Sequence, residues 1–284
     1  MKELLQKAAE HFHISSFFSP EMDAPDLAGD SNRGLVRRHN EDSYIYIKGS
    51  RKTPTVAIVA DGIGGHHNGD IASGLLVRLF LEKWRKYIEE GKKYSRKELE
   101  LFLNTLFLAI NDAIAKINKR FGSTHPMGTT LSAVAFYHHF LISCHSGDSR
   151  LYRIRAGKIR RMTNDHSIEL PEVLRVKLAQ EIAERVVQDG KCYTQKSRSV
   201  PRHMITRAIG TKKGCPPEYN LFRVKKLDRY ILCSDGLFLH LSDEEICEIV
   251  QNSSNPGKAV NRLINTALQR GGKDNVTIIG AFFN

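Results

Sequence analysis

The chain has 284 residues, of which 41% are hydrophobic and 26% are charged, and its formal net charge is +12. This composition is typical of a globular protein, and the length suits one large domain or two small ones. No apolar run approaches the roughly 18 residues that cross a bilayer, so a membrane-spanning protein is excluded, and the positive charge favours acidic or phosphorylated partners.

Residues 1–28 form an N-terminal extension that we expect to be helical. Leu4 and Ala8 have helical spacing, and Pro20 breaks the pattern. Glu10 lies where an export signal would have an uninterrupted apolar core, so no signal of that kind is expected. A helix docked on the domain surface and a targeting or partner-binding helix are both compatible with this pattern.

The next part of the chain predicts two strands, two amphipathic helices and a series of short strands. Tyr44–Ile47 and Thr55–Ala60 are expected strands, a helix is expected from Gly69 to about Tyr87, and another follows Ser95. Short turns separate the later strands, which indicates an antiparallel meander because such links cannot hold parallel crossovers. These strands are Thr130–Tyr137, Phe140–His145, Arg150–Arg155 and Lys158–Met162.

Residues 164–204 change character and predict an excursion from the domain. The remaining apolar patterns predict strands and then a pair of helices before a final strand. They are strands Leu221–Val224 and Arg229–Cys233, helices Asp243–Gln251 and Lys258–Gln269, and strand Val276–Phe283. Strands in hairpins with helices in pairs predict an α+β fold, a four-layer α-β-β-α sandwich with two central antiparallel sheets and a flap subdomain.

Five short acidic patches recur along the chain, and most of them follow apolar, strand-like runs. Packing explains such carboxylates poorly, whereas Mg²⁺ or Mn²⁺ explains them well because these cations need several oxygen ligands at one point. A single patch could equally be a simple Asp-Gly turn, but five of them indicate that several strands deliver acids to one edge. The patches are Asn40-Glu41-Asp42, Asp61-Gly62, Gly147-Asp148-Ser149-Arg150, Ser234-Asp235-Gly236 and Lys273-Asp274-Asn275.

These patches belong to a longer ordered series of short motifs. The series is Gly34–Asp42, Val59–His66, Gly69–Ser73, Met127–Thr130, Gly147–Arg150, Asp165–Ser167, Ile205–Gly210, Ser234–Leu237 and Gly272–Thr277. In order and spacing it resembles the metal-dependent serine/threonine protein phosphatases of the type 2C family, in their bacterial form. The resemblance covers about residues 29–284, which would form the catalytic domain, with a flap at about residues 164–204.

The resemblance implies a site for two Mn²⁺ or Mg²⁺ ions. By motif position, Asp61 is expected to bridge the ions. Asp235 and Asp274 are expected to complete one ion's ligands, while Glu41 and the Gly62 carbonyl serve the other. Two close cations would lower the pKa of a bridging water and neutralise charge on a phosphoryl group.

Two further residues have roles implied by the same motifs. Asp42 is expected to hold a water molecule bound to one ion, and Arg37 to grip the substrate phosphate, which a guanidinium can do through two oxygens at once. We expect phosphoserine and phosphothreonine to be hydrolysed by direct attack of the metal-bridging water or hydroxide. The chain has no DxDx[TV] segment that would supply an aspartyl nucleophile, which agrees with a reaction without a phosphoenzyme.

A third ion is an open alternative. Asp148 fits its position in the family, with help from Asp235. Another acid often follows the TRA-x-G segment in such relatives, but here residues 211–214 are Thr-Lys-Lys-Gly. Asp148 could equally cap the turn in which it lies.

The general acid is also open. His39, His66 and His67 lie close in sequence to expected ligands, and each could protonate the leaving group or serve only as a structural or solvated residue. His166 is expected to fix the entry to the flap. Basic residues within the flap could recognise acidic or multiply phosphorylated segments, or form a solvated loop: Lys191, Lys196, Arg198 and Arg202.

We therefore expect a phosphatase that acts on phosphoproteins and opposes a serine/threonine kinase, as a monomer. Five cysteines without a CxxC pair favour reduced thiols and a cytoplasmic location. Two rival readings are a phosphoprotein-binding pseudoenzyme, which the intact acids disfavour, and a basic protein associated with nucleic acid, which the scattered charge disfavours.

Overall fold

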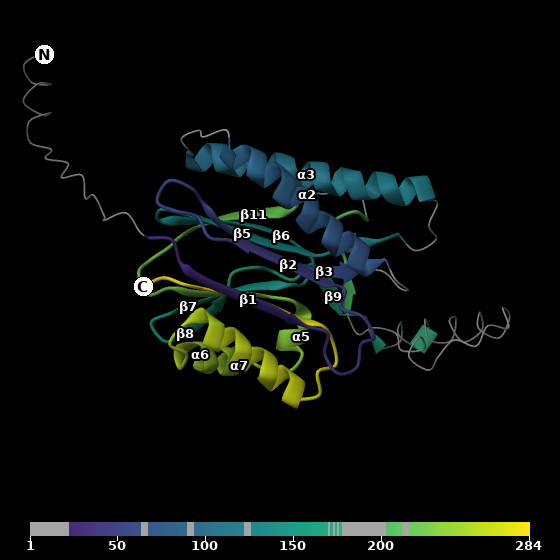
Figure 1. Ribbon diagram of the computed structural model, residues 1–284. Coiled ribbons are helices and arrows are strands. Elements are labelled where there is room, and N and C mark those ends of the chain that lie inside the picture. Colours follow the sequence, from purple (N-terminus) through teal and green to yellow (C-terminus); the bar gives the residue numbers. More distant parts are fainter. Residues whose placement is uncertain are drawn as a thin grey trace, which may run out of the picture.

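The structure is a computed structural model that describes residues 23–63, 68–89, 94–121, 126–169, five residues between 171 and 177, 203–211 and 216–284. Two stacked sheets lie between two layers of helices (Figure 1). This confirms the expected α-β-β-α sandwich. Residues 1–22 of the extension that was expected to be helical lie outside the described residues, as do most of the flap, His66 and His67, whereas residues 26–28 of that extension belong to a strand.

One sheet has five antiparallel strands in the order β1-β13-β12-β7-β8. Its strands span Asp26–Asn32 (β1), Arg150–Arg155 (β7), Lys158–Arg161 (β8), Arg229–Cys233 (β12) and Val276–Phe282 (β13). The strand β1 was not predicted, and it runs across residue 28, where the sequence suggested that the extension ends. Its sequence DLAGDSN has little apolar alternation, so its strand character comes from pairing with β13, in which Ala28 lies opposite Gly280.

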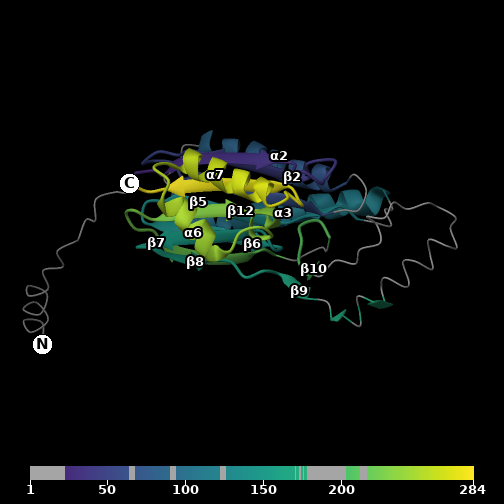
Figure 2. The same ribbon diagram turned by 90° about the horizontal axis from the view of Figure 1, so that it is seen from below.

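The other sheet has the order β11-β6-β5-β3-β2, and a short strand β4 pairs with β3. Its strands span Asp42–Ile47 (β2), Thr55–Ile63 (β3), Gly128–Thr129 (β4), Leu131–Tyr137 (β5), Phe140–Ser146 (β6) and Glu218–Arg223 (β11). Strands β9 (Ser167–Glu169) and β10 (His203–Ile205) form a separate pair at one end of the sandwich (Figure 2).

The expected single meander of residues 130–162 is wrong. Strands β5 and β6 form a hairpin in one sheet, whereas β7 and β8 form a hairpin in the other. The chain changes sheets at Gly147, whose φ of 113° lies in a region that favours glycine. Short loops had indicated antiparallel hairpins correctly, but loop length does not tell which sheet receives the next hairpin.

Helices cover the outer face of each sheet (Figure 1). The helices α2 (Gly69–Glu89) and α3 (Arg96–Phe121) pack on the sheet that contains β3, where the Phe80 and Phe107 rings stack with centroids 5.8 Å apart. The helices α5 (Asp235–Phe238), α6 (Asp243–Gln251) and α7 (Pro256–Gln269) pack on the other sheet. In the described part of the chain, no helix has both the length and the apolar character to cross a membrane.

Local capping explains why the C-terminal helices begin where they do. Ser242 and Glu245 form a capping box at α6, and Asn255 accepts a hydrogen bond from the Lys258 backbone N–H at the start of α7, where Pro256 occupies the first turn. Between the sheets a third core contains the rings of Phe136, Tyr230 and Phe283, with Phe136 and Tyr230 centroids 5.2 Å apart. This double-sheet core is the rigid base from which the site residues project.

Candidate active site

Two of the acidic patches meet through the pairing of β2 with β3. Asp42 lies directly opposite Asp61 in the antiparallel register. Glu41 immediately precedes β2, and its carbonyl accepts the backbone N–H of Gly62 at 3.1 Å. The backbone of Asp61 is held by the neighbouring Thr129-Thr130 segment, since the Thr130 N–H donates to the Asp61 carbonyl at 2.8 Å and Thr130 Oγ1 accepts the Asp61 N–H at 2.9 Å.

Two other acidic patches meet where β12 ends and β13 begins. Cys233 of β12 lies opposite Ile278 of β13, so Asp235 leaves one strand at the same edge at which Asp274 precedes the other. The Ser234 N–H donates to the Thr277 carbonyl at 3.0 Å, which holds these two strand ends together.

The carboxylate of Asp42 joins the two sheets at this edge. Its Oδ2 accepts hydrogen bonds from Ser234 Oγ at 2.7 Å and from Thr277 Oγ1 at 2.6 Å. Its Oδ1 is buried and has no partner. Sequence segments almost 200 residues apart in the chain therefore meet at Asp42, and one carboxylate oxygen remains as an unsatisfied acceptor.

Asn275 holds the loop that precedes β2. Its Oδ1 accepts the Glu41 backbone N–H at 2.8 Å, and its Nδ2 donates to the carbonyls of Arg33 at 2.8 Å and His39 at 3.0 Å. The same loop makes a close approach at Gly34, whose φ is 78° and where a Cβ atom would stand 2.2 Å from the Asp274 carbonyl oxygen. These contacts fix the position of the loop residues between them.

Arg37 lies in that loop and pairs with Asp274. Its Nη2 is 2.5 Å from Asp274 Oδ2, while its side chain remains 49% exposed, so the guanidinium lies at the solvent side of the acidic group. Asp235 and Glu41 are also close enough to help raise the pKa of Arg37. The sequence-predicted phosphate-binding arginine therefore lies beside three of the predicted ligands.

The start of α2 closes the site behind Gly62. A Cβ atom at Gly62 would stand 2.2 Å from the Gly69 carbonyl oxygen and 2.7 Å from the Glu41 carbonyl oxygen, so only glycine fits. Asp70, in the first turn of α2, contributes to a raised pKa of Glu41, for which burial is the larger cause. Asp70 was not among the predicted site residues, although the Gly69–Ser73 motif that contains it was recognised.

Asp148 joins the same cluster from the turn between β6 and β7. Its charge is among those that raise the pKa values of Asp61 and Asp235. Gly147 is required here, because a Cβ atom at that position would stand 2.6 Å from the side chain of Thr130. All of the acids predicted as ligands therefore lie around one edge of the sandwich.

The acids cannot all be ionised easily in the absence of a cation. Burial raises the pKa of Asp42 to about 6, and burial together with repulsion by neighbouring carboxylates raises the pKa values of Asp61 and Asp235 well above the usual range. Repulsion is the expected cost of bringing carboxylates together without a counter-charge, and a bound cation would relieve it.

This chemistry fits a hard divalent cation. All of the gathered donors are oxygens, and the unpaired Oδ1 of Asp42 shows that the site has unused acceptor capacity. In the described part of the chain, however, no group of three or more His, Cys, Asp or Glu side chains is arranged to hold an ion. The backbone therefore brings the ligands together, but side chains such as Asp274, which pairs with Arg37, would have to turn toward a cation.

Of the three histidines that could act as the general acid, His39 is the one within the described part of the chain, whereas His66 and His67 lie outside it. His39 is exposed and lies near Glu41, where it partly offsets the rise in the Glu41 pKa that burial causes. His166 has a positioning contact at the base of the flap, where its Nε2 is 3.1 Å from Glu218 Oε2 and its carbonyl accepts the Thr206 N–H at 2.8 Å.

Several polar residues that position the site were missed by sequence reasoning as site residues. Ser234, Asn275 and Thr277 lie within the recognised motifs, but the expected roles at these motifs belonged to the neighbouring acids Asp235 and Asp274. Their signal is positional: each lies within three residues of Asp235 or Asp274, where a polar side chain can reach across the paired strand ends.

Comparisons with known proteins agree with this architecture. The sequence profile of the family described as Protein phosphatase 2C matches residues 27–276. The chain is 30% identical over 250 residues to the serine/threonine phosphatase stp of Listeria innocua, which covers 88% of this chain and 92% of that protein. It is 34% identical over 255 residues to the serine/threonine protein phosphatase PstP of Mycobacterium tuberculosis, which covers 89% of this chain and 44% of that protein.

Solved structures show the same similarity in three dimensions. The crystal structure of the Mycobacterium tuberculosis phosphatase PstP/Ppp has a TM-score of 0.69 at 32% sequence identity and covers 92% of this chain and 99% of that one. The catalytic domain of PstP in complex with 2 manganese ions has a TM-score of 0.68 at 32% identity and covers 91% of this chain and 98% of that one.

Proposed function

This chain is a serine/threonine phosphatase that belongs to the protein phosphatase 2C family, and we propose that it hydrolyses phosphoserine and phosphothreonine in proteins with two bound Mn²⁺ or Mg²⁺ ions. The observation that carries the proposal is the meeting of Glu41, Asp61, Asp235 and Asp274 around the paired ends of β2, β3, β12 and β13. The solved relative in complex with 2 manganese ions supports the number of ions.

We assign the cation ligands as in the sequence-based expectation. Glu41, Asp61, Asp235 and Asp274 would hold the ions through carboxylate oxygens, and Gly62 through its carbonyl. When bound, the two cations supply a water nucleophile of lowered pKa and neutralise charge on the phosphoryl group. Asp148 would serve a third ion, an assignment supported only by its charge lying near Asp61 and Asp235.

Arg37 would bind and orient the substrate phosphate. Its half-exposed guanidinium lies at the mouth of the acidic group and can donate to two phosphate oxygens at once. In the absence of substrate the same donor is paired with Asp274, so phosphate and Asp274 would compete for it.

Asp42 would hold a proton of the attacking water. Ser234 and Thr277 occupy its Oδ2, which leaves Oδ1 as the acceptor that faces no protein donor. The hydrogen bonds from both hydroxyls fix the carboxylate, so its position does not depend on the bound water. Loss of these hydroxyls would loosen the carboxylate without removing any cation ligand.

Hydrolysis of p-nitrophenyl phosphate tests the catalytic proposal. The wild type should turn over with Mn²⁺, lose activity with a chelator, and lose it in the Asp61→Asn variant. Phosphoserine and phosphothreonine peptides should then be substrates, and release of inorganic phosphate should occur without a trapped phosphoenzyme. No turnover with any divalent cation would favour a phosphoprotein-binding pseudoenzyme instead.

The finer biological setting is part of the same proposal. A phosphatase for phosphoproteins implies a serine/threonine kinase that supplies its substrates. The protein would then act in signalling, as a monomer in the cytoplasm. Similarity to the phosphatases stp and PstP supports the reaction class. The basic flap residues, which lie outside the described part of the chain, would add contacts to acidic substrates.

A further inference from the structure

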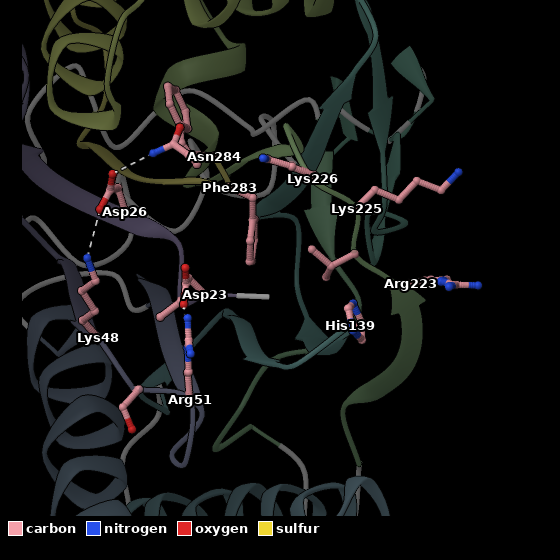
Figure 3. Close-up of a pocket in the computed structure, with 14 residues that line it drawn as sticks. Asp23, Asp26, Lys48, Arg51, His139, Arg223, Lys225, Lys226, Phe283 and Asn284 are labelled. Carbon is pink, nitrogen blue, oxygen red and sulfur yellow. Dashed lines mark hydrogen bonds and ion pairs between the residues drawn. The ribbon is translucent and has the colours of Figure 1, made fainter. Parts of the chain in front are cut away.

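A cavity of about 1060 Å³ lies where β1 begins and β13 ends, and Figure 3 shows the residues that line it. It is lined by residues around the start of β1, the β2–β3 turn, the β5–β6 turn, the β11–β12 connection and the end of β13. Strand β3 begins near this end of the sandwich at Thr55 and reaches Asp61 six residues later, a rise of roughly 20 Å. The cavity is therefore separate from the proposed catalytic site.

On one wall of the cavity, two acids and two bases pair with each other, so their charges cancel. Arg51 Nε is 2.9 Å from Asp23 Oδ1, and Lys48 Nζ is 2.9 Å from Asp26 Oδ1. The Asn284 side chain donates to the second oxygen of Asp26 at 3.1 Å (Figure 3). These acids are thus already paired with cations of the same wall.

The opposite wall has an excess of positive charge. Arg223, Lys225 and Lys226 are exposed and line the cavity, together with His139. Figure 3 shows the Lys226 side chain extending toward Phe283, whereas Arg223 and Lys225 extend outward from the rim. Among the residues that the structure describes, no carboxylate forms an ion pair with these three cations.

Asp228 is the acid nearest in sequence to these cations, but its carboxylate pairs with Arg155 instead. The Asp228 carboxylate is fully buried and accepts two hydrogen bonds from Arg155, at 2.5 and 2.6 Å. It also accepts the Lys225 backbone N–H at 2.8 Å, which fixes the connection that carries the cations. The positive wall is therefore held in place by a carboxylate whose charge is neutralised by another residue.

An exposed apolar side chain stands next to the cations. Leu227 is 71% exposed and has a φ of 64°, a left-handed conformation that is uncommon for leucine. The neighbouring β5–β6 turn contains a second such residue, His138, with a φ of 52°. Beneath the rim, Val224 and Phe283 supply buried apolar surface. The three cations and Leu227 thus lie together at the end of β11 and in its connection to β12, and the Val224 N–H ties this connection to the β5–β6 turn by donating to the His139 carbonyl at 2.9 Å.

We propose that this cavity is a docking site for an acidic peptide segment of a partner protein, a function beyond the catalytic one. Glutamate or aspartate side chains would pair with Arg223, Lys225 and Lys226, and an apolar residue of the segment would contact Val224 and Phe283, which line the cavity. The volume lies at the upper end of the range of roughly 300–1,000 Å³ that is usual for small-molecule pockets, so the cavity has room for several residues of an extended peptide. The apolar contacts favour a peptide over nucleic acid.

Direct binding to the full chain tests this proposal without involving catalysis. The probe is a fluorescein-labelled peptide of alternating glutamate and leucine, about twelve residues long, which spans roughly 40 Å when extended. It has no phosphate, and the buffer contains a chelator, so failure of the phosphatase proposal would leave the measurement unaffected. Fluorescence anisotropy gives the dissociation constant at low and at physiological salt.

Two variants with equal loss of charge separate docking from general attraction to a basic protein. The rim variant carries Arg223→Gln, Lys225→Gln and Lys226→Gln. The control variant carries Arg85→Gln, Arg96→Gln and Lys97→Gln, which are exposed cations on α2 and α3. Circular dichroism and urea unfolding establish that both variants fold like the parent chain.

The rim variant should bind the peptide about tenfold more weakly, because exposed ion pairs are individually weak but three are lost together, and the control variant should bind like the wild type. Replacing glutamate by glutamine in the probe should abolish the difference between the variants. Equal weakening in both variants, or absence of binding to the wild type, would overturn the proposal. Tighter binding of an oligothymidylate of equal charge, lost in the rim variant, would also overturn it by assigning the site to nucleic acid.

Discussion

Replacement of Asp228 by alanine should lower the free energy of unfolding by about 3 kcal/mol. The Asp228 side chain is fully buried and accepts hydrogen bonds from Arg155 Nε and Nη2, the Tyr230 hydroxyl and the Lys225 N–H. Removing one partner of a buried ion pair costs about 3–5 kcal/mol, because the remaining charge and donors lose their acceptor. Arg155 is 26% exposed and can regain some hydration, which places the effect at the lower end of this range.

Urea unfolding in the presence of a chelator measures this effect. The only tryptophan, Trp84, is buried in the core between α2 and the β3 sheet, whereas Asp228 bonds to Tyr230 of the core between the two sheets, so Trp84 fluorescence reports unfolding from a separate core. For a slope of about 3 kcal/mol per molar urea, the midpoint should fall by about 1 M. Circular dichroism should give the same midpoint if unfolding is a two-state process.

A matched aspartate provides the control. Asp26 also pairs with a cation, Lys48, but its side chain is 52% exposed, and such surface pairs contribute about 0–1 kcal/mol. Asp26→Ala should therefore shift the midpoint by less than a third as much as Asp228→Ala. Similar shifts in both variants, or a loss below about 1 kcal/mol for Asp228→Ala, would refute the reasoning that burial decides the contribution of these pairs.

Two further predictions concern the phosphate-binding residue and a buried histidine. Arg37→Ala should lower kcat/KM for p-nitrophenyl phosphate with Mn²⁺ about 100-fold, and Arg37→Lys should recover only part of it, since lysine cannot hold two oxygens in the same way; unchanged kinetics would contradict the assignment. His145 is buried, and burial lowers its pKa to about 4, so the unfolded chain takes up a proton first as the pH falls from about 6.5 to 4, and this lowers stability. Between pH 7 and pH 5, the free energy of unfolding measured in urea should fall by about 2 kcal/mol more in the wild type than in the His145→Gln variant. An equal fall in both proteins would contradict the lowered pKa of His145.

Local elements of this protein could be predicted because local interactions determine them. The helix α6 begins and ends at the expected Asp243 and Gln251, since an amphipathic pattern and the Ser242–Glu245 capping box act over a few residues. In contrast, β1 was missed because its strand character depends on β13, some 250 residues later in the chain. The change of sheet at Gly147 was missed for the same reason.

In the candidate site, too, the residue types could be predicted from the sequence but the contacts between them could not. The residue types were predictable, since carboxylates in glycine turns at strand ends indicated a cation site before any contact was known. The contacts that position them were not predictable: Asn275 reaches Glu41, and Thr277 reaches Asp42, through bonds that depend on how β2 and β13 are placed in different sheets. Asp70 next to Glu41 likewise follows from the packing of α2 on the sheet.

The sequence by itself determined which short segments become helices and strands and which chemical groups lie at their ends, because propensity, capping and alternation act between near neighbours. Only the tertiary structure decided that Asp42 lies opposite Asp61, that Arg37 pairs with Asp274, and that Arg223, Lys225 and Lys226 line a cavity at the other end. The physical reason is that strand register and sheet packing are set by the burial of apolar surface from many distant segments at once, and no single segment contains that information.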